Sequence, residues 1–466
     1  MQVKIKFLGG AKTVTGSRYL LEIGNQKLLV DCGLFQGLKE LRLRNWEAFP
    51  INASEIDAVI LTHAHIDHSG YLPKLVKEGF NGPIYCTTPT AELVKILLAD
   101  SAKLQEEEAA YAQKKGYSKH EKPQPLYGIA DAEQVTPLLV PINIETPFSI
   151  NDSISFTFFY AGHILGAAIL KIKLKGAQQE KKIVFSGDLG RYHDPLLHAP
   201  SRIPFADILL MESTYGNRPQ THAKPEDDLA LAIRDTYRRG GVAVIPAFAV
   251  GRTQMILYYL HLLQEKGKIP NIPIYVDSPM AIDVTRLYKD FGSYHRLGAL
   301  IEDKETNPFL HKNIHYYQNQ EASMSLNAIK GDAIIISASG MASGGRIVHH
   351  LYNRLPNEQD SIIFVGYQAE GTRGRNLLEG DPTIKMYGMD IPVKAKVFYI
   401  EGLSAHADQD ELIEWAEGFT SRPKMTFLVH GEKDASSALA ERLQEELDWH
   451  PIIPEYLESF VLFDGI

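Results

Sequence analysis

The sequence predicts an α/β protein in which a region of parallel sheet interrupts a mixed arrangement of strands and helices. Two observations lead to this fold class. Short segments rich in β-branched residues recur along the chain, and from about residue 225 they alternate with helical segments. Alternation of this kind is typical of parallel strands joined by crossover helices. The composition, with 44% hydrophobic and 23% charged residues, is that of a globular protein.

The expected elements follow in chain order. Strands are predicted at residues 3–8, 18–23, 27–31, 57–62, 154–160, 168–174, 182–186 and 207–212, with a hairpin turn at Gly24-Asn25 and helical structure over 88–115. The alternating region has helices at 226–239 and 252–265 and strands at 242–246, 273–277, 333–337 and 361–365. The last part has strands at 395–400 and 425–429 and helices at 409–418 and 435–447.

The bulk properties of the chain narrow the class of protein. The 466 residues allow roughly two to four domains of ordinary size. Two cysteines, Cys32 and Cys86, are too few for a disulfide framework, which fits a reducing compartment. The N-terminus lacks the apolar core of a signal peptide, and no apolar run reaches the ~18 residues of a spanning helix. We therefore expect a cytoplasmic protein without contact to a membrane.

The net charge of −9 argues mildly against a nucleic-acid partner, because nucleic-acid-binding proteins usually carry a basic surface. Net charge does not describe one local site, however. A bound metal cluster can supply a positive field of its own.

The strongest functional signal is a cluster of metal-ligand residue types directly after the strand 57–62. This histidine segment, residues 63–68, reads His-Ala-His-Ile-Asp-His. The spacing of His63 and His65 places both imidazoles on one side of an extended backbone. The next turn directs Asp67 and His68 elsewhere, so the segment can serve two metals, and both ligand types suit Zn²⁺. A solvated histidine-rich turn is the alternative explanation.

Three further residues of ligand type occupy the same kind of position. His163, Asp188 and His430 each follow a predicted strand directly or within a few residues, and each has a glycine beside it that lets the backbone turn. Alone, each would more often be an ordinary loop residue. The repeated placement makes them candidates for the same site.

On these residues the sequence resembles the metallo-β-lactamase superfamily, whose His-x-His-x-Asp-His signature it matches without a substitution. Features of the β-CASP branch, the nucleases of RNA processing and DNA repair, occur in chain order as Glu212, His406 and His430. Members with histidine at the last position act mainly on RNA. The resemblance covers nearly the whole chain and is greatest to compact prokaryotic relatives of the nuclease subunit of the eukaryotic cleavage and polyadenylation factor.

The resemblance implies a complete catalytic site with two Zn²⁺ per chain. The implied metal ligands are His63, His65 and His163 for one ion, Asp67, His68 and His430 for the other, and Asp188 as a bridge. A water between the metals would attack as hydroxide near neutral pH. His406, oriented by Glu212, would donate a hydrogen bond or proton towards the leaving oxygen, and Asp67 would belong to the catalytic residues with them. Products would carry 5′-phosphate and 3′-hydroxyl ends.

Three glycine-rich segments in the alternating region are candidates for contacts with phosphate. Residues 248–254 and 337–346 each follow a strand and lead into a helix, where free backbone N–H groups can bind phosphate. Residues 366–375 add two arginines and an aromatic side chain. Turn formation alone is an equally good explanation for any one segment. We expect substrate contacts from Arg252, Ser339, Ser343 and Gly344.

The predicted architecture is a metallo-β-lactamase αββα sandwich with an inserted parallel-sheet β-CASP domain. The expected domains are residues 1–212, the insertion at 213–394, and residues 395–466, which complete the first domain. The expected function is that of a zinc-dependent ribonuclease acting on single-stranded RNA as an endonuclease. A 5′→3′ exonuclease activity and a homodimer are left open.

Two other functions fit part of the sequence. A small-molecule metallo-hydrolase, such as a thioesterase, sulfatase or lactonase, would share the metal ligands but has no use for a large insert with three candidate phosphate loops. A catalytically silent scaffold that binds RNA or protein would be expected to lose ligands, and every ligand sought is present. Of the 17 histidines, six are assigned to chemistry and the other eleven to surface or packing.

Overall fold

The structure, a computed structural model, describes residues 1–115, 123–177, 179–219, 224–368 and 371–465. The chain divides into two compact units. Unit 1 comprises Met1–Asp194, His198–Gln220 and His406–Ile466, and unit 2 comprises Pro195–Leu197 and Thr221–Ala405. Unit 2 is therefore an insertion that the chain enters from unit 1 and leaves again for unit 1.

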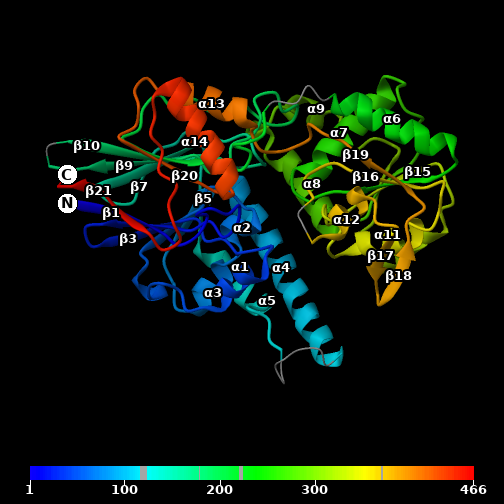
Figure 1. Ribbon diagram of the computed structural model, residues 1–466, viewed down its shortest axis with the longest axis horizontal. Helices are drawn as coiled ribbons and strands as arrows, with labels where there is room; N and C mark the ends of the chain where they lie inside the picture. The colour runs from blue at the N-terminus through cyan, green and yellow to red at the C-terminus, as the bar shows by residue number, and fades with distance from the viewer. Residues whose placement is uncertain (116–122, 178, 220–223, 369–370, 466) are drawn as a thin grey trace. The chain divides into compact units, whose positions relative to one another are not determined.

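Unit 1 contains two mixed β-sheets. The first has the order β21-β1-β2-β3-β4-β5-β6, and the second has the order β20-β11-β10-β9-β8-β7. The strands of the first sheet are β1 (Gln2–Phe7), β2 (Tyr19–Ile23), β3 (Gln26–Val30), β4 (Ala58–Ile60), β5 (Ile84–Thr87), β6 (Leu139–Ile142) and β21 (Ser459–Asp464). Those of the second are β7 (Phe148–Ser149), β8 (Ile154–Tyr160), β9 (Ala168–Lys175), β10 (Glu180–Phe185), β11 (Ile208–Glu212) and β20 (Met425–Val429). Both termini lie at one end of unit 1 (Figure 1), because β1 and β21 pair antiparallel.

A single apolar core lies between these two sheets. Phe7 and Leu21 enter it from the first sheet, and Phe156, Leu170 and Phe427 enter it from the second. In β8 buried residues alternate with partly exposed ones over most of the strand, as expected when one face of a strand is packed and the other is not. Each sheet thus buries its inner face against the other sheet.

Helices pack on the sheets of unit 1 as the αββα sandwich requires. The long helix α4 contacts β5 and β6 of the first sheet, and α14 contacts β20 of the second. The helices of unit 1 are α1 (Lys39–Leu43), α2 (Ile66–Ser69), α3 (Leu72–Lys77), α4 (Thr88–Lys115), α5 (Ile129–Glu133), α13 (Gln409–Glu417) and α14 (Lys433–Leu447). The predicted fold class of this unit is confirmed, and the helical stretch 88–115 is one helix.

Unit 2 is built on a six-stranded sheet of order β14-β13-β15-β12-β16-β19 in which every neighbouring pair is parallel. Its strands are β12 (Val242–Pro246), β13 (Ile274–Val276), β14 (Ile314–Tyr316), β15 (Ala333–Ser337), β16 (Ser361–Phe364) and β19 (Lys396–Tyr399). Beside it lie α6 (Pro225–Arg238), α7 (Arg252–Glu265), α8 (Pro279–Asp290), α9 (Gly298–Glu302), α10 (Gln320–Ser325), α11 (Arg346–Arg354), α12 (Arg373–Glu379) and the hairpin of β17 (Thr383–Met386) and β18 (Met389–Pro392). The predicted parallel-sheet insert is confirmed.

The limits of the insert differ from the expected residues 213 and 394. Residues 213–219 remain with unit 1, and β19 is paired in parallel with β16 of unit 2, so the return to unit 1 comes at His406. A strand-helix alternation continues on both sides of this point. The pattern therefore predicts β19 as a strand without indicating which sheet it joins.

The helices of the described residues include none that is both long and apolar enough to cross a membrane. Cys32 and Cys86 are buried and unpaired, as small apolar residues would be.

Candidate metal centre

Backbone hydrogen bonds hold the histidine segment in place after β4. The N–H groups of Ser17 and Cys32 donate to the carbonyl oxygens of Asp67 and His68, at 2.8 and 2.7 Å. The neighbouring Gly33 permits this approach, because a Cβ at that position would lie 1.6 Å from the carbonyl oxygen of Asp67. The segment is thus fixed by its backbone before any ligand binds.

Two loops of the second sheet bring His163 and Asp188 together. His163 follows β8 and Asp188 follows β10, and the N–H of Gly190 donates to the carbonyl of Ala161 at 2.7 Å. A Cβ on Gly190 would lie 1.8 Å from the carbonyl oxygen of Gly162, so only glycine fits this contact between the loops. Gly162 and Gly187, the glycines beside the two ligands, have φ of 73° and 57° and let the backbone turn, whereas Gly190 serves the close packing of the loops.

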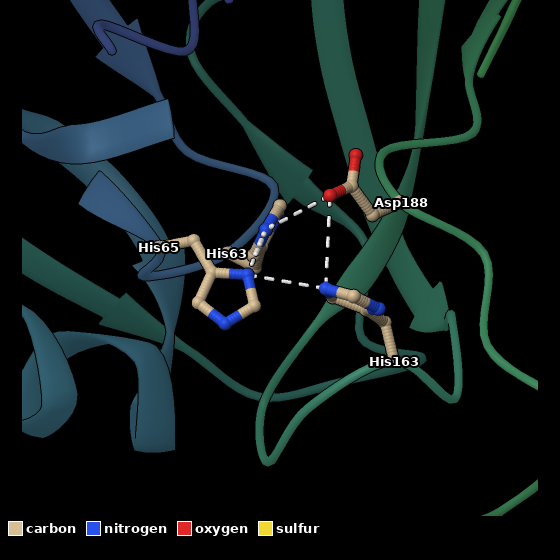
Figure 2. A group of neighbouring side chains, drawn as sticks. All are labelled: His63, His65, His163 and Asp188. Carbon is tan, nitrogen blue, oxygen red and sulfur yellow. Dashed lines mark hydrogen bonds and ion pairs between the residues drawn. The ribbon is translucent and has the colours of Figure 1, made fainter. Parts of the chain in front are cut away.

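The side chains of His63, His65, His163 and Asp188 form the first group of candidate ligands. Figure 2 shows ring nitrogens of the three histidines facing one another and one oxygen of Asp188. His65 Nδ1 lies 3.2 Å from His63 Nε2 and 3.1 Å from His163 Nε2. Asp188 Oδ2 lies 3.4 Å from His63 Nε2 and 3.6 Å from His163 Nε2. Four donor atoms from three loops thus converge on one point.

Asp67, His68 and His430 form the second group. His430 Nε2 lies 3.2 Å from Asp67 Oδ2, and His68 Nε2 lies 4.0 Å from the same oxygen. Asp188 also faces this group, since its Oδ1 lies 3.3 Å from His68 Nε2 and 3.4 Å from His430 Nδ1. One oxygen of Asp188 is therefore turned to each group.

The charge states of these side chains suit a cation. Burial, together with the neighbouring His68, lowers the pKa of His63 well below its usual value, and burial lowers the pKa of His65 to about 4. Both rings are therefore neutral at pH 7, which is the form that ligates metals. Burial alone would raise the pKa of Asp188, but the surrounding imidazoles, His430 first, hold it well below its usual range.

Unsatisfied polar atoms provide an independent test of whether a metal fits. Within the described residues, His68 Nε2 and Asp188 Oδ1 are buried and form no hydrogen bond. Burial opposes a charge on His68, but Asp188 and Asp31 raise its pKa well above its usual value. Without a metal, the proton on His68 provides the positive charge that a bound divalent cation would otherwise provide. Imidazole with carboxylate is a donor set that zinc accepts. The residues fit a metal centre.

Sequence reasoning missed a carboxylate that orients one of these imidazoles. Asp31, at the end of β3, is fully buried and accepts a hydrogen bond from His68 Nδ1 at 2.8 Å. It also accepts from the N–H and the hydroxyl of Thr62, at 2.7 and 2.8 Å. A carboxylate behind an imidazole fixes the ring and its tautomer in metal sites. The signal was present in the sequence, since Asp31 is a polar residue at a strand end with a glycine nearby.

His430 is positioned by a similar contact and by an uncommon backbone conformation. Its Nδ1 lies 3.0 Å from the hydroxyl oxygen of Thr214, and its N–H donates to the carbonyl of Gly10 at 2.7 Å. His430 and Asp31 have φ of 48° and 59°, in the left-handed region that non-glycine residues seldom occupy. Such residues cluster at functional sites, where surrounding contacts hold them.

His406 and Glu212 form a pair beside the first group. His406 Nδ1 lies 3.3 Å from Oε1 of the fully buried Glu212, and the His406 ring lies 4.4 Å from that of His163. Burial lowers the pKa of His406, but the charge of Glu212 outweighs it and raises the pKa to about 9. Asp408 caps α13 in a capping box with Glu411, as the sequence indicated, so His406 stands just before a helix start.

The four residues expected to contact substrate all lie in unit 2, at loops that follow adjacent parallel strands. Ser339, Ser343 and Gly344 share one loop after β15, where Ser343 N–H and Ser339 Oγ are 3.3 Å apart. Arg252 begins α7 after β12, the neighbour of β15, and its Nε lies within 3.9 Å of the position a Cβ on Gly366 would take. The structure brings the three glycine-rich loops to one edge of the sheet; residues 369 and 370 of the third lie outside the described residues.

A buried carboxylate that the sequence did not single out anchors one of these loops. Asp277, at the end of β13, accepts hydrogen bonds from Arg346 Nη1 and His350 Nε2, both at 2.7 Å, and from the hydroxyl of Ser323 at 2.6 Å. Arg346 directly follows Gly345, the last residue of the loop after β15. Asp277 therefore fixes the end of that loop.

Comparison with known proteins agrees with this geometry. Three family profiles match in chain order: metallo-beta-lactamase superfamily over residues 13–238, Beta-Casp domain over 253–377, and Zn-dependent metallo-hydrolase RNA specificity domain over 390–454. A solved structure described as a protein of unknown function from Enterococcus faecalis V583 aligns over 99% of this chain and all of its own, with a TM-score of 0.54. At 16% identity this match shows the fold alone.

Curated relatives match along nearly the whole chain. Ribonuclease TTHA0252 of Thermus thermophilus is 36% identical over 95% of this chain and 96% of its own length. RNase J-like protein of Methanocaldococcus jannaschii is 31% identical over 97% and 98% of the two chains. Transcription termination factor FttA of Methanosarcina mazei is 33% identical over 96% of this chain and 69% of its own length.

Fold and site together define a metal-dependent hydrolase on the metallo-β-lactamase scaffold. More narrowly, the chain belongs to the β-CASP family of that superfamily, the family of RNA-processing nucleases. The resemblance inferred from the histidine segment, Glu212, His406 and His430 is thereby confirmed.

Proposed function

We propose that this protein is a zinc-dependent ribonuclease that hydrolyses phosphodiester bonds of single-stranded RNA and leaves 5′-phosphate and 3′-hydroxyl ends. The observation that carries the proposal is Asp188, whose two oxygens face two separate groups of candidate ligands. If each group held one cation, Asp188 would serve both, and such a pair of cations would supply the charge that displacement at phosphorus needs. The name of the T. thermophilus relative, a ribonuclease, and the family description of residues 390–454 support RNA as the substrate.

In this proposal each group of ligands holds one ion. The first ion is assigned to His63, His65 and His163, the second to Asp67, His68 and His430, and Asp188 is assigned to both. When bound, the ions supply positive charge for the phosphate oxygens and lower the pKa of a water molecule. Asp67, Asp188, Asp31 and Glu212 carry four negative charges, against four positive charges of two Zn²⁺ ions and one of protonated His406. The local site would therefore remain positive although the chain carries a net charge of −9.

The proposed reaction is a simple hydrolysis. The oxygen of water forms a bond to phosphorus and the water gives up a proton to solvent, the bond from phosphorus to the 3′ oxygen breaks, and that oxygen takes a proton. We assign this proton to His406, the catalytic acid, because Glu212 raises the pKa of the ring and so favours its protonated form. Glu212 is a positioning residue, since it acts through His406 by its charge and its 3.3 Å contact.

RNA binding is assigned chiefly to unit 2. Ser339, Ser343, Gly344 and Arg252 lie on loops at the carboxyl ends of parallel strands, the edge where open sheets of this kind bind ligands. The position of these loops at the starts of α7 and α11 and the charge of Arg252 suit a phosphate chain. Contacts to phosphate rather than to base edges would make the binding tolerant of sequence.

A reconstitution assay tests the proposal against its rivals. Chelator-treated protein is reloaded with zinc and incubated with labelled RNA, DNA of the same sequence, and a thioester. We expect cleavage of RNA only after zinc is added, none by His68→Ala, and unchanged cleavage by His193→Ala, an exposed histidine of unit 1. Turnover of the thioester with intact RNA would favour a small-molecule hydrolase, and RNA binding without any cleavage would favour a scaffold.

A further inference from the structure

A third cluster of ligand-type side chains lies in unit 2, remote in sequence from the centre described above. His261 and Glu265 are four residues apart on α7 and so share one face of that helix. His311 comes from the segment that precedes β14. One ligand atom of each residue lies within 4.8 Å of the others.

The contacts in this cluster resemble those of an open metal site. His311 Nε2 lies 3.7 Å from Glu265 Oε1, and the rings of His261 and His311 meet edge to face with centroids 5.4 Å apart. The side chain of Glu265 is 61% exposed and that of His311 is 14% exposed. The cluster is thus partly buried on its histidine side and open to solvent at the carboxylate, which leaves room for a water ligand.

Buried nitrogens without partners add a second, independent observation. The Nδ1 atoms of His261 and His311 are buried and form no hydrogen bond within the part of the chain that the structure describes. The same feature marks His68 and Asp188 in the metal centre. A buried polar atom without a partner costs free energy, and coordination of a metal through that Nδ1 atom would remove the cost.

The backbone of the cluster also favours binding. The backbone before His311 is fixed, because Asn307 donates to the carbonyl of Ile301 at 2.9 Å and the buried Phe309 packs on Tyr288. An ion would therefore meet a site that is largely formed.

We propose that His261, Glu265 and His311 form an additional binding site for a divalent transition-metal ion of the zinc type, separate from the proposed catalytic centre. Two imidazoles and one carboxylate are a donor set that zinc prefers. The ion would link α7 to the segment before β14, an edge strand of the sheet in unit 2. Its role is structural, since it would hold together two elements that also meet through an ion pair, a ring contact and a 3.5 Å contact from Asn313 Nδ2 to Gln264 Oε1.

Metal stoichiometry tests this site in the full-length protein. Wild type, the double variant His261→Gln/His311→Gln and the control His315→Gln are stripped with chelator, dialysed against Zn²⁺ alone and analysed for metal per chain. His315 is an exposed histidine four residues from His311 that is not in the cluster. We expect the double variant to bind one zinc fewer than wild type and the control to bind the same number. The difference does not depend on how many ions the catalytic centre takes.

Hydrogen exchange keeps the test decisive if the double variant is less stable. With zinc, amides of α7 and of residues 309–316 should exchange at least tenfold more slowly in wild type than without zinc, and this protection should be absent in the double variant. Equal zinc content in wild type and double variant, or no zinc-dependent protection of these two segments, would show that the cluster is only an ion pair. We expect the double variant to cleave RNA like wild type. Zinc content and hydrogen exchange are measured without RNA, so a failure of the proposed ribonuclease activity would not affect this test.

Discussion

Replacing Glu212 by glutamine is the sharpest perturbation of the proposed acid. A glutamine at this position would keep the shape of the side chain, and its carbonyl can still accept the hydrogen bond that Leu189 N–H donates to Glu212 at 2.5 Å. What the substitution removes is the negative charge 3.3 Å from His406 Nδ1. The variant Glu212→Gln therefore separates the charge of Glu212 from its packing.

The structure sets the size of the effect. Burial disfavours the charged ring, yet Glu212 leads the contributions that raise the pKa of His406 from 6.5 to about 9. That rise corresponds to ~3 kcal/mol in favour of the protonated form. Without the carboxylate, burial still opposes the charged ring and only the smaller contributions of Asp188 and Tyr215 favour it, so the pKa should fall well below 9. At pH 7.5 the protonated fraction would then drop from roughly 97%, and a pKa back at 6.5 would leave roughly 10%.

Two assays measure this change in the protonation of His406. The pKa of His406 is measured by NMR on ¹³C-histidine-labelled, metal-free protein, because bound cations lower the pKa of a nearby imidazole. Cleavage is measured against pH on zinc-loaded protein, where Glu212→Gln should lose on the order of 10²–10⁴ in rate and keep its metal content. A His406 pKa still near 9, or full activity in the variant, would refute the assignment of Glu212. Loss of metal would mean that the pair is structural.

Three further predictions follow from the site. Asp67→Ala and His68→Ala should abolish cleavage. Their RNA affinity in a filter-binding assay should stay within about threefold of wild type, since binding is assigned to unit 2. RNA affinity lost together with activity would contradict that division. Asp31→Asn should lower zinc affinity on the order of 10–100-fold in competition with a chelator, because His68 loses its orienting carboxylate; unchanged affinity would remove Asp31 from the site. Arg252→Ala should weaken RNA binding and reduce the slope of log affinity against log salt concentration by about one ion. Replacing Arg286, an exposed arginine of the same unit, by alanine should do neither. Equal slopes for both variants would mean that RNA binds elsewhere.

Much of the fold could be predicted because it rests on periodic burial. Strands such as β12 and β15 and helices such as α7 are long, apolar or strictly patterned, and their observed limits match the expected ones. The shorter strands β5 and β6 were not predicted. β5 leads directly into the long helix α4, and β6 contains Pro141, which suits an edge strand but masks the pattern.

The metal ligands could be predicted for a different reason, and the residues that were missed share one cause. The histidine segment concentrates four residues of ligand type in six positions, and no common structural demand produces that pattern. Asp31 and Asp277 are single carboxylates whose partners, His68 and Arg346, are brought to them only by the fold. His261 and His311, expected to be surface or packing residues, are likewise joined only in three dimensions.

Hydrolysis in ¹⁸O-labelled water tests the central claim most directly. Zinc-loaded protein is incubated with a single-stranded RNA in H₂¹⁸O, and the fragments are analysed by mass spectrometry. We expect every cleavage to place one ¹⁸O in a 5′-phosphate and to leave a 3′-hydroxyl on the other fragment, because water attacks phosphorus and the bond to the 3′ oxygen breaks. Fragments that end in 3′-phosphate or 2′,3′-cyclic phosphate, or cleavage that survives removal of the metal, would contradict the proposed function.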